Sequence, residues 1–228
     1  MKKYLYGASI QGIQSFIFKT NKLKEIIGAS ELVEKICTTK FFELSELKRN
    51  SVDIIQSAAG NVKCILTEEQ CRSIVLKFPM EAQKIAPGIT VSQAVVAFND
   101  GEAPPIDELE RKLKIQRNII APPIEIGYMG LERDRRTGGV AFEEKVTRKS
   151  KEIISRETKA KIDAIFSDQE FKDDVSKEAL FTKISALSNV SNRDLSFDIE
   201  DITRSGNNSW IAIIHADGNG LGQIIQNN

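Results

Sequence analysis

The first hundred residues alternate between short β-rich runs and helical patterns, and the order of these runs constrains the fold more than any other feature. Four runs are apolar and β-rich: residues 4–9, 52–57, 62–66 and 89–98. The second and third are separated only by Ala58-Ala59-Gly60-Asn61, and glycine and asparagine tolerate the positive φ of a hairpin turn. Apolar residues recur at helical spacing before and after this hairpin. The order strand–helix–strand–strand–helix–strand predicts an α+β, ferredoxin-like βαββαβ domain over residues 1–100.

Glycine, serine and proline set the expected helix boundaries in this domain. Gly12 is expected to open the first helix, directly after the first strand. Gly28 interrupts a short apolar cluster, and Ser30 is a suitable N-cap for the helix that follows. Residues 68–85 have the spacing of another helix, which Pro79 would bend or end.

The second half of the chain carries weaker signals. Residues 101–208 are predicted to be a linker followed by a mainly helical insertion, because Pro104-Pro105 break regular structure and a charged helical pattern covers residues 143–187. Residues 107–118 predict an amphipathic helix, and residues 124–129 have the pattern of a short strand.

A basic stretch lies within this second half. Ten basic residues between Arg133 and Lys161 outnumber five acidic ones. One interpretation is a surface that faces RNA or a protein partner. The other is a solvated helix held by i,i+4 pairs such as Glu152–Arg156 and Glu157–Lys161. The second is favoured, because aromatic residues that could stack on bases are nearly absent from the stretch.

The composition excludes several classes of protein. Lysine plus arginine and aspartate plus glutamate both number 32, so no net charge attracts the chain to nucleic acid or to a membrane. Three cysteines without a Cys-x-x-Cys pair argue against a zinc ribbon or a disulfide framework, and favour buried or idle thiols. The single histidine, His215, excludes a multi-histidine metal centre. Because the sequence has no membrane-length apolar segment and no signal-peptide pattern, we expect a cytoplasmic protein.

Residues 211–226 carry the strongest functional signal. An apolar run predicts a buried strand that delivers Asp217 to its carboxyl end, and a glycine-rich turn then leads into a helix. Ligands collect at that edge of an open α/β sheet, helix N-termini attract phosphate, and a carboxylate there can hold Mg²⁺. We therefore expect Asp217 to bind a metal ion. The expected nucleotide contacts in the turn are Gly218, Asn219, Gly220, Leu221 and Gly222. The alternatives are a helix N-cap for the aspartate and a tight turn for the glycines.

Two segments resemble the palm domains in the large subunit of type III CRISPR effector complexes. The N-terminal segment YLYGASIQGIQSFIFKTNKLKEIIGASELVEKI is similar to the opening of the first palm, with its Gly-Ile-Gln-x-Phe-Ile run. The C-terminal segment HADGNGLGQII resembles the first strand–turn–helix of the second palm, usually Asp-Gly-Asp-x-Leu-Gly. The resemblance implies a first palm over residues 1–100, an insertion over 101–208, and the incomplete start of a second palm over 209–228.

In that family the second palm resembles nucleotidyl cyclases and polymerases. It binds ATP with Mg²⁺ or Mn²⁺ through the aspartate of its first strand and through a Gly-Gly-Asp-Asp hairpin. Asp217 matches the first position, and the hairpin is absent from these 228 residues. Asn219 departs from the family's aspartate and would be a weaker Mg²⁺ ligand. The turn Ala58-Ala59-Gly60-Asn61 of the first palm has no carboxylate, which fits a palm without a metal site of its own.

The resemblance also assigns a role to four residues where the first strand meets the first helix. It implies that Ser9, Gln11, Gly12 and Gln14 line a nucleotide pocket across the interface between the palms. A polar turn that satisfies its own hydrogen bonds explains them equally well.

The function implied by the resemblance is synthesis of cyclic or linear oligoadenylate from ATP in antiviral defence. We expect the chain to be the front portion of a longer polypeptide, inactive alone, and to bind Mg²⁺ only with a complete second palm. Expected partners are ATP, other CRISPR effector subunits, and guide or target RNA. The His-Asp nuclease domain and cysteine cluster of many family members have no counterpart in the sequence. The alternative function is a non-catalytic scaffold or an RNA- or protein-binding palm module.

Overall fold

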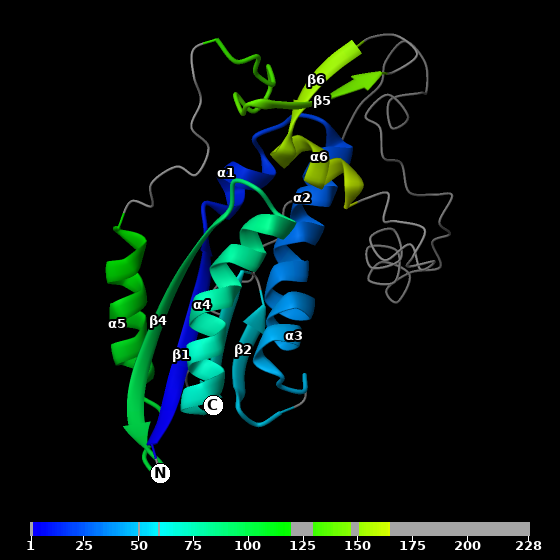
Figure 1. Ribbon diagram of the computed structural model, residues 1–228. Coiled ribbons are helices and arrows are strands. Elements are labelled where there is room, and N and C mark those ends of the chain that lie inside the picture. The colour runs from blue at the N-terminus through cyan, green and yellow to red at the C-terminus, as the bar shows by residue number, and fades with distance from the viewer. Residues whose placement is uncertain (1, 50, 59, 120–129, 147–150, 165–228) are drawn as a thin grey trace, which may run out of the picture.

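The computed structural model describes residues 2–49, 51–58, 60–119, 130–146 and 151–164 (Figure 1). Its centre is a four-stranded antiparallel sheet with the strand order β2-β3-β1-β4. The strands are β1 (Lys2–Gln11), β2 (Ile54–Ala58), β3 (Asn61–Leu66) and β4 (Thr90–Asn99). All four β-rich runs of the first hundred residues are therefore strands, and the α+β class is confirmed.

Helices from both sides of the β2–β3 hairpin cover one face of this sheet. The helical segments are α1 (Ile13–Ile17), α2 (Leu23–Lys35), the π-helical turn Ile36–Lys40, α3 (Phe41–Ser45) and α4 (Glu68–Ile85). Figure 1 shows α3 and α4 lying along the sheet. Tyr6 of β1 stacks on Phe41 with ring centroids 6.3 Å apart, and Phe41 meets Phe78 of α4 edge-on at 5.8 Å. These aromatic rings form the centre of the main hydrophobic core.

Helix α2 is continuous where the sequence predicts a break. Gly28 is buried in the middle of α2, and Ser30 is an exposed residue within it rather than an N-cap. The expectation of a helix that begins at Ser30 is therefore wrong. A glycine inside a helix costs about 1 kcal/mol relative to alanine. The buried face of α2, which includes Ala29, Leu32 and Val33, offsets that cost through packing.

Helix α4 has the predicted bounds and does not end at Pro79, which lies inside it. Proline has no backbone N–H, so the carbonyl of Val75 loses its partner four residues along the helix. The Gln93 side chain of β4 replaces that partner, because its Nε2 donates to the Val75 carbonyl at 2.7 Å. Gln93 is held in turn by the Tyr6 hydroxyl, which donates to its Oε1 at 3.0 Å. A side chain from the neighbouring strand thus replaces the hydrogen bond that Pro79 removes.

The opposite face of the sheet is covered by α5 (Ile106–Arg117), the amphipathic helix that the sequence predicts. Leu109 and Leu113 of α5 are buried against β1 and β4. Gly7 of β1 permits this close approach, because a Cβ at residue 7 would lie 2.8 Å from Leu109 Cδ2. Figure 1 shows α5 beside β4, apart from the other helices.

A small hairpin and a helix follow in the second half of the chain. The hairpin pairs β5 (Ala141–Val146) with β6 (Lys151–Ser155), and α6 (Arg156–Asp163) follows directly. The helix expected from residue 143 therefore begins only at residue 156, where the Ser155 hydroxyl caps it by accepting from the backbone N–H of Thr158. Charged residues on both strands hide the β alternation that would have predicted the hairpin.

The structure also changes the interpretation of the basic stretch. Glu152 lies on β6, so it forms no helical pair with Arg156. Glu157 and Lys161 do form the expected i,i+4 pair, at 2.8 Å, but both are buried rather than solvated.

Several sequence predictions fall outside the described residues. These are the strand at 124–129, the helical pattern beyond residue 164, and the start of a second palm at 209–228. Within the described ranges, no helix has both the length and the apolar content that crossing a membrane requires.

Candidate functional site

A polar edge forms where the end of β1 meets the turn between β2 and β3. Ser9 lies opposite Asn61 in the strand register, and its Oγ donates to Asn61 Oδ1 at 2.8 Å. The backbone N–H of Ile10 donates to the Gly60 carbonyl at 2.8 Å. Gly60 has a φ of +77°, and a Cβ there would lie 2.3 Å from Ile13 Cδ1, so the turn requires glycine. Residues 9–14 and residues 60–61 are therefore brought together at one end of the sheet.

The residues that follow Ser9 extend this edge into α1. Gln11 folds back so that its Nε2 donates to the Ser9 carbonyl at 3.2 Å. Gly12 is the N-cap of α1 with a φ of +62°, and a Cβ there would have no atom within 4 Å. Gln14 is exposed in the first turn of α1. Ser9 and Gln11 are thus in contact, and Gly12 and Gln14 leave open surface beside them.

Arg117 completes the edge, and the sequence analysis did not identify it. This residue ends α5, and its Nη2 donates to Ser9 Oγ at 3.0 Å. Leu109, Leu113 and Arg117 are spaced four residues apart on one face of α5, and the first two pack on the sheet. An arginine at the third position of an otherwise apolar helix face is the sequence signal that could have identified this residue.

This edge presents side chains that donate hydrogen bonds, and one of them is a cation. A hydroxyl, two amides and a guanidinium can bind an anion or the edge of a base. They do not supply carboxylates for a divalent metal, and the described part of the chain contains no group of three or more His, Cys, Asp or Glu residues placed to hold one. The six other predicted site residues lie outside the described residues: Asp217, Gly218, Asn219, Gly220, Leu221 and Gly222.

The sequence repeats the pattern of this edge near its other end. Ala8-Ser9-Ile10-Gln11-Gly12 aligns with Ala216-Asp217-Gly218-Asn219-Gly220, with alanine and the last glycine identical and glutamine against asparagine. Ser9 therefore occupies, in the first pattern, the position that Asp217 occupies in the second. The two segments differ at three of these five positions, and only the second has a carboxylate among them, that of Asp217.

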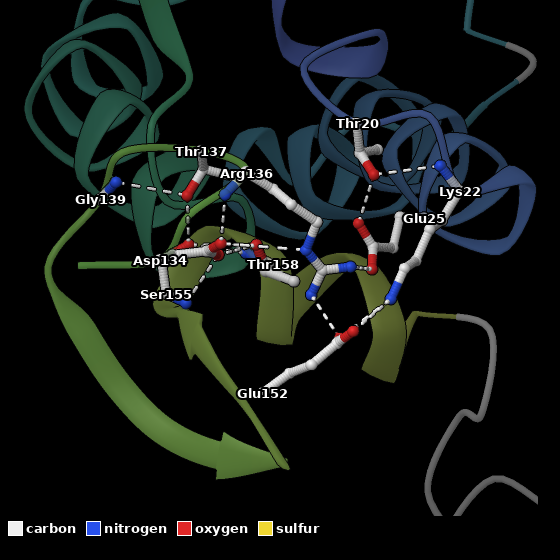
Figure 2. Close-up of polar contacts among 10 residues, drawn as sticks. All are labelled: Thr20, Lys22, Glu25, Asp134, Arg136, Thr137, Gly139, Glu152, Ser155 and Thr158. Carbon is white, nitrogen blue, oxygen red and sulfur yellow. Dashed lines mark hydrogen bonds and ion pairs between the residues drawn. The ribbon is translucent and has the colours of Figure 1, made fainter. Parts of the chain in front are cut away.

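A second polar cluster joins the hairpin region to α2 (Figure 2). Asp134, which is 1% exposed, accepts hydrogen bonds from Thr158 Oγ1 at 2.6 Å and from the backbone N–H groups of Ser155 and Arg136. Burial alone would raise the pKa of this carboxyl, but the hydrogen bonds from Thr158, Ser155 and Arg136 outweigh it and hold the pKa well below its usual value. Because every contact is internal, we interpret Asp134 as a structural carboxylate.

Arg136 links this cluster to the helices, as Figure 2 shows. Its Nη1 donates to Glu25 Oε1 at 2.5 Å, and Glu25, which is 2% exposed, also accepts from Thr20 Oγ1 at 2.6 Å. Its Nη2 lies 3.3 Å from Glu152 Oε2 without hydrogen-bond geometry. Lys22 also contacts Glu152, at 2.9 Å. The arrangement anchors the segment around residue 136 and β6 to the start of α2.

A buried lysine connects α6 to α1 near the polar edge. Lys161 Nζ donates to the Phe16 carbonyl at 2.5 Å and to Glu157 Oε1 at 2.8 Å. It also lies 4.2 Å from the centroid of the Phe16 ring. The other oxygen of Glu157 pairs with Lys19 at 2.8 Å. Because α1 follows the β1 edge directly, α6 fixes the helix that carries Gln14.

The three cysteines are buried free thiols, as predicted. Burial raises the pKa of Cys37 and of Cys64 to about 12, and it also raises the pKa of Cys71. Such thiols are neutral at physiological pH and therefore poor nucleophiles.

A shallow pocket of about 280 Å³ lies beside the edge strand β4. Its apolar lining includes Val75 of α4, Val95 of β4 and Ile115 of α5. Leu76 and Met80 of α4 are also exposed, at 77% and 54%. The pocket shares no lining residue with the polar edge, although Ile115 and Gln116 of its lining directly precede Arg117.

Comparisons with known proteins find similarity at the level of structure. No family model and no curated protein matches the sequence. A Csm1–Csm4 cassette in complex with AMPPNP has a TM-score of 0.37 and 18% identity, over 51% of this chain and 19% of that chain. The Csm1–Csm4 subcomplex of the type III-A CRISPR-Csm interference complex has a TM-score of 0.40 and 15% identity, over 51% and 18%. A cassette in complex with pppApApA has a TM-score of 0.41 and 15% identity, over 51% and 19%.

These solved structures come from the family that the two sequence segments resemble. The match spans less than a fifth of the length of those chains.

Proposed function

We propose that the sheet domain is the first palm of a nucleotide-binding protein related to the type III CRISPR large subunit. The observation that carries the proposal is the composition of the β1 edge. Ser9 and Asn61 hydrogen-bond there, at the end of the first strand and in the hairpin, where a catalytic palm of this family carries its carboxylates. The βαββαβ connectivity and the strand order β2-β3-β1-β4 support the palm assignment.

A palm with this edge is suited to be the partner of a catalytic palm. Its hydroxyl, amides and guanidinium bind a nucleotide by hydrogen bonds and leave metal binding to the second palm. Asp217 is the proposed metal ligand, and the turn from Gly218 to Gly222 is the proposed phosphate contact. Mg²⁺ held there would neutralise charge on the phosphate oxygens. The complete protein would then join ATP into cyclic or linear oligoadenylate: a 3′-hydroxyl loses its proton and attacks an α-phosphate, and the bond from that phosphorus to the β-phosphate oxygen breaks to release pyrophosphate.

Calorimetric titration of ATP, with and without Mg²⁺, tests this proposal. We expect the protein with a complete second palm to bind ATP and to bind it more tightly with Mg²⁺, and we expect Asp217→Asn to remove only the Mg²⁺ effect. Asp107→Asn, a change of the same charge at an exposed position of α5, is the matched control. No detectable binding of ATP at millimolar concentration, or a Mg²⁺ effect that Asp217→Asn leaves intact, would contradict the proposal.

A second candidate function is a non-catalytic scaffold. The observation that favours it is the apolar surface beside β4, where the pocket lined by Val95 and Ile115 adjoins a strand at the edge of the sheet. Apolar side chains next to an edge strand are typical of protein contacts. A Mg²⁺ effect on ATP binding that depends on Asp217 separates the nucleotide-binding palm from the scaffold.

A further inference from the structure

Arg117 is placed by the packing of α5 on the sheet. Leu5, Gly7 and Ser9 are every second residue of β1, so they lie on the same face of the strand, the one that α5 covers. Leu109 and Leu113 pack against the first part of that face. One turn further along α5, Arg117 reaches Ser9, one alternation further along β1. The contacts between α5 and β1 are therefore apolar except at this end, where an arginine meets a buried serine.

Ser9 forms hydrogen bonds through its hydroxyl with two neighbouring side chains. Its side chain is buried, with the residue 4% exposed. Its Oγ donates to Asn61 at 2.8 Å and accepts from Arg117 Nη2 at 3.0 Å. A guanidinium has five N–H donors, so the contact with Ser9 leaves most of them available. The serine thus orients the arginine without neutralising it.

Arg117 forms no ion pair with an acidic residue in the described parts of the chain. The ion pairs of α5 involve other residues. Glu110 pairs with Lys63, and Glu108 pairs with Lys112. Arg117 is exposed, and the edge around it consists of amides and a hydroxyl. An oriented arginine without a carboxylate partner is suited to binding phosphate oxygens, which its planar fork matches.

We propose that Arg117 binds the phosphate groups of the nucleotide and that Ser9 is the residue that orients it. The inference rests on the proposed function, because it names the part of the nucleotide that the first palm takes. It assigns to α5 a direct contact with the phosphate groups, in addition to the contacts proposed for the strand edge and the metal site.

The test compares three ligands on two arginine variants of the whole protein. ATP, adenosine and inorganic tripolyphosphate are titrated into the wild type, Arg117→Met and Arg111→Met. Arg111 is exposed on the same helix, so its loss changes the net charge equally. We expect Arg117→Met to weaken ATP and tripolyphosphate by about tenfold, as for the loss of one charge-assisted contact, and to leave adenosine unchanged. Arg111→Met should leave all three affinities unchanged.

Ser9→Ala tests the orienting role while the arginine stays in place. We expect a smaller loss of tripolyphosphate affinity than for Arg117→Met, because the guanidinium remains but is no longer held. Thermal unfolding of each variant should match the wild type closely enough that all proteins are folded during titration.

The outcomes separate this inference from the proposed function. The inference is overturned if Arg117→Met does not lower the affinity for ATP, or if it lowers the affinities for adenosine and ATP equally. Either result leaves the nucleotide-binding palm in place. Tripolyphosphate binding that depends on Arg117, without any binding of ATP, supports the phosphate site and overturns the palm proposal. No binding of any of the three ligands overturns both.

Discussion

At the scale of single residues, Lys161 has an unusual environment for a lysine. It has no exposed surface, and its ammonium group contacts Glu157 and the Phe16 carbonyl. Removing one partner of a buried ion pair leaves the other charge without compensation. The chain offers a contrast in Glu68–Arg72, an i,i+4 pair with the same helical spacing on the solvent-exposed side of α4.

We expect Lys161→Met to lower the free energy of unfolding by about 3 kcal/mol, at the lower end of the range for a broken buried pair, because Lys19 still contacts Glu157. Denaturant unfolding measures this loss. Arg72→Met, the control, should change stability little, because exposed pairs contribute little. Adding Glu157→Gln to Lys161→Met should recover part of the loss, and no recovery would show that the charge of Glu157 is not its cause.

Asp134 predicts a dependence of stability on pH. Its pKa is depressed in the folded protein, since the hydrogen bonds from Thr158 and the two backbone N–H groups outweigh its burial. A depressed pKa stabilises the fold above the pKa of the unfolded chain, about 3.9, and this contribution is lost as the pH falls toward the lower folded value. We expect Asp134→Asn to reduce stability by a constant amount above about pH 5, and this difference to shrink below pH 4. A difference that stays constant down to pH 2 would contradict the assignment.

At the scale of elements, α4 depends on a strand residue for a hydrogen bond that its own backbone lacks. Gln93→Leu leaves the Val75 carbonyl and the Tyr6 hydroxyl without their partner, so we expect a loss of about 1–3 kcal/mol. Pro79→Ala restores a backbone N–H to Val75, and Gln93→Leu should therefore cost less in that background. A double-mutant cycle by denaturant unfolding measures the difference. Equal costs in both backgrounds would mean that Gln93 does not compensate for Pro79.

Local patterns predicted some of these elements and hid others. The strands of the sheet alternate clearly, and α4 begins with a Thr67–Gln70 capping box, so their bounds follow from nearby residues. The β5–β6 hairpin was missed because charged side chains mask its alternation. The buried charge of Glu25 has its partner 111 residues away, at Arg136, and no local pattern contains such a contact. In the same way, Ser9 and Gln11 were predicted as site residues from the strand end and the family resemblance, whereas the contact of Arg117 with Ser9 depends on the packing of α5 on the sheet.

At the scale of the whole molecule, the segment made of residues 131–146 and 151–163 is attached to the helices over the sheet by buried charges. Arg136 contacts Glu25 of α2 and Glu152 of β6, and Lys161 of α6 contacts the end of α1. Figure 1 shows β5, β6 and α6 gathered at the end of the molecule where α1 and α2 begin. The main core lies between the sheet and its helices, and Ala160 of the segment packs against it. We expect the segment to open without unfolding the sheet, because the core residues themselves belong to the sheet and its helices.

Arg136→Met tests this division directly. The variant leaves Glu25 buried with Thr20 as its remaining donor among the described residues and removes the contact to Glu152, so the hairpin should open more often. We expect amide hydrogen exchange to accelerate by about tenfold or more in β5, β6, α6 and the start of α2, and to stay unchanged in β1 to β4, because a local opening exposes only the amides that it releases. Arg135→Met, an exposed neighbour with the same charge, should leave exchange unchanged. Equal acceleration in the sheet would instead mean that the two parts unfold as one unit, and that Arg136 stabilises the whole fold.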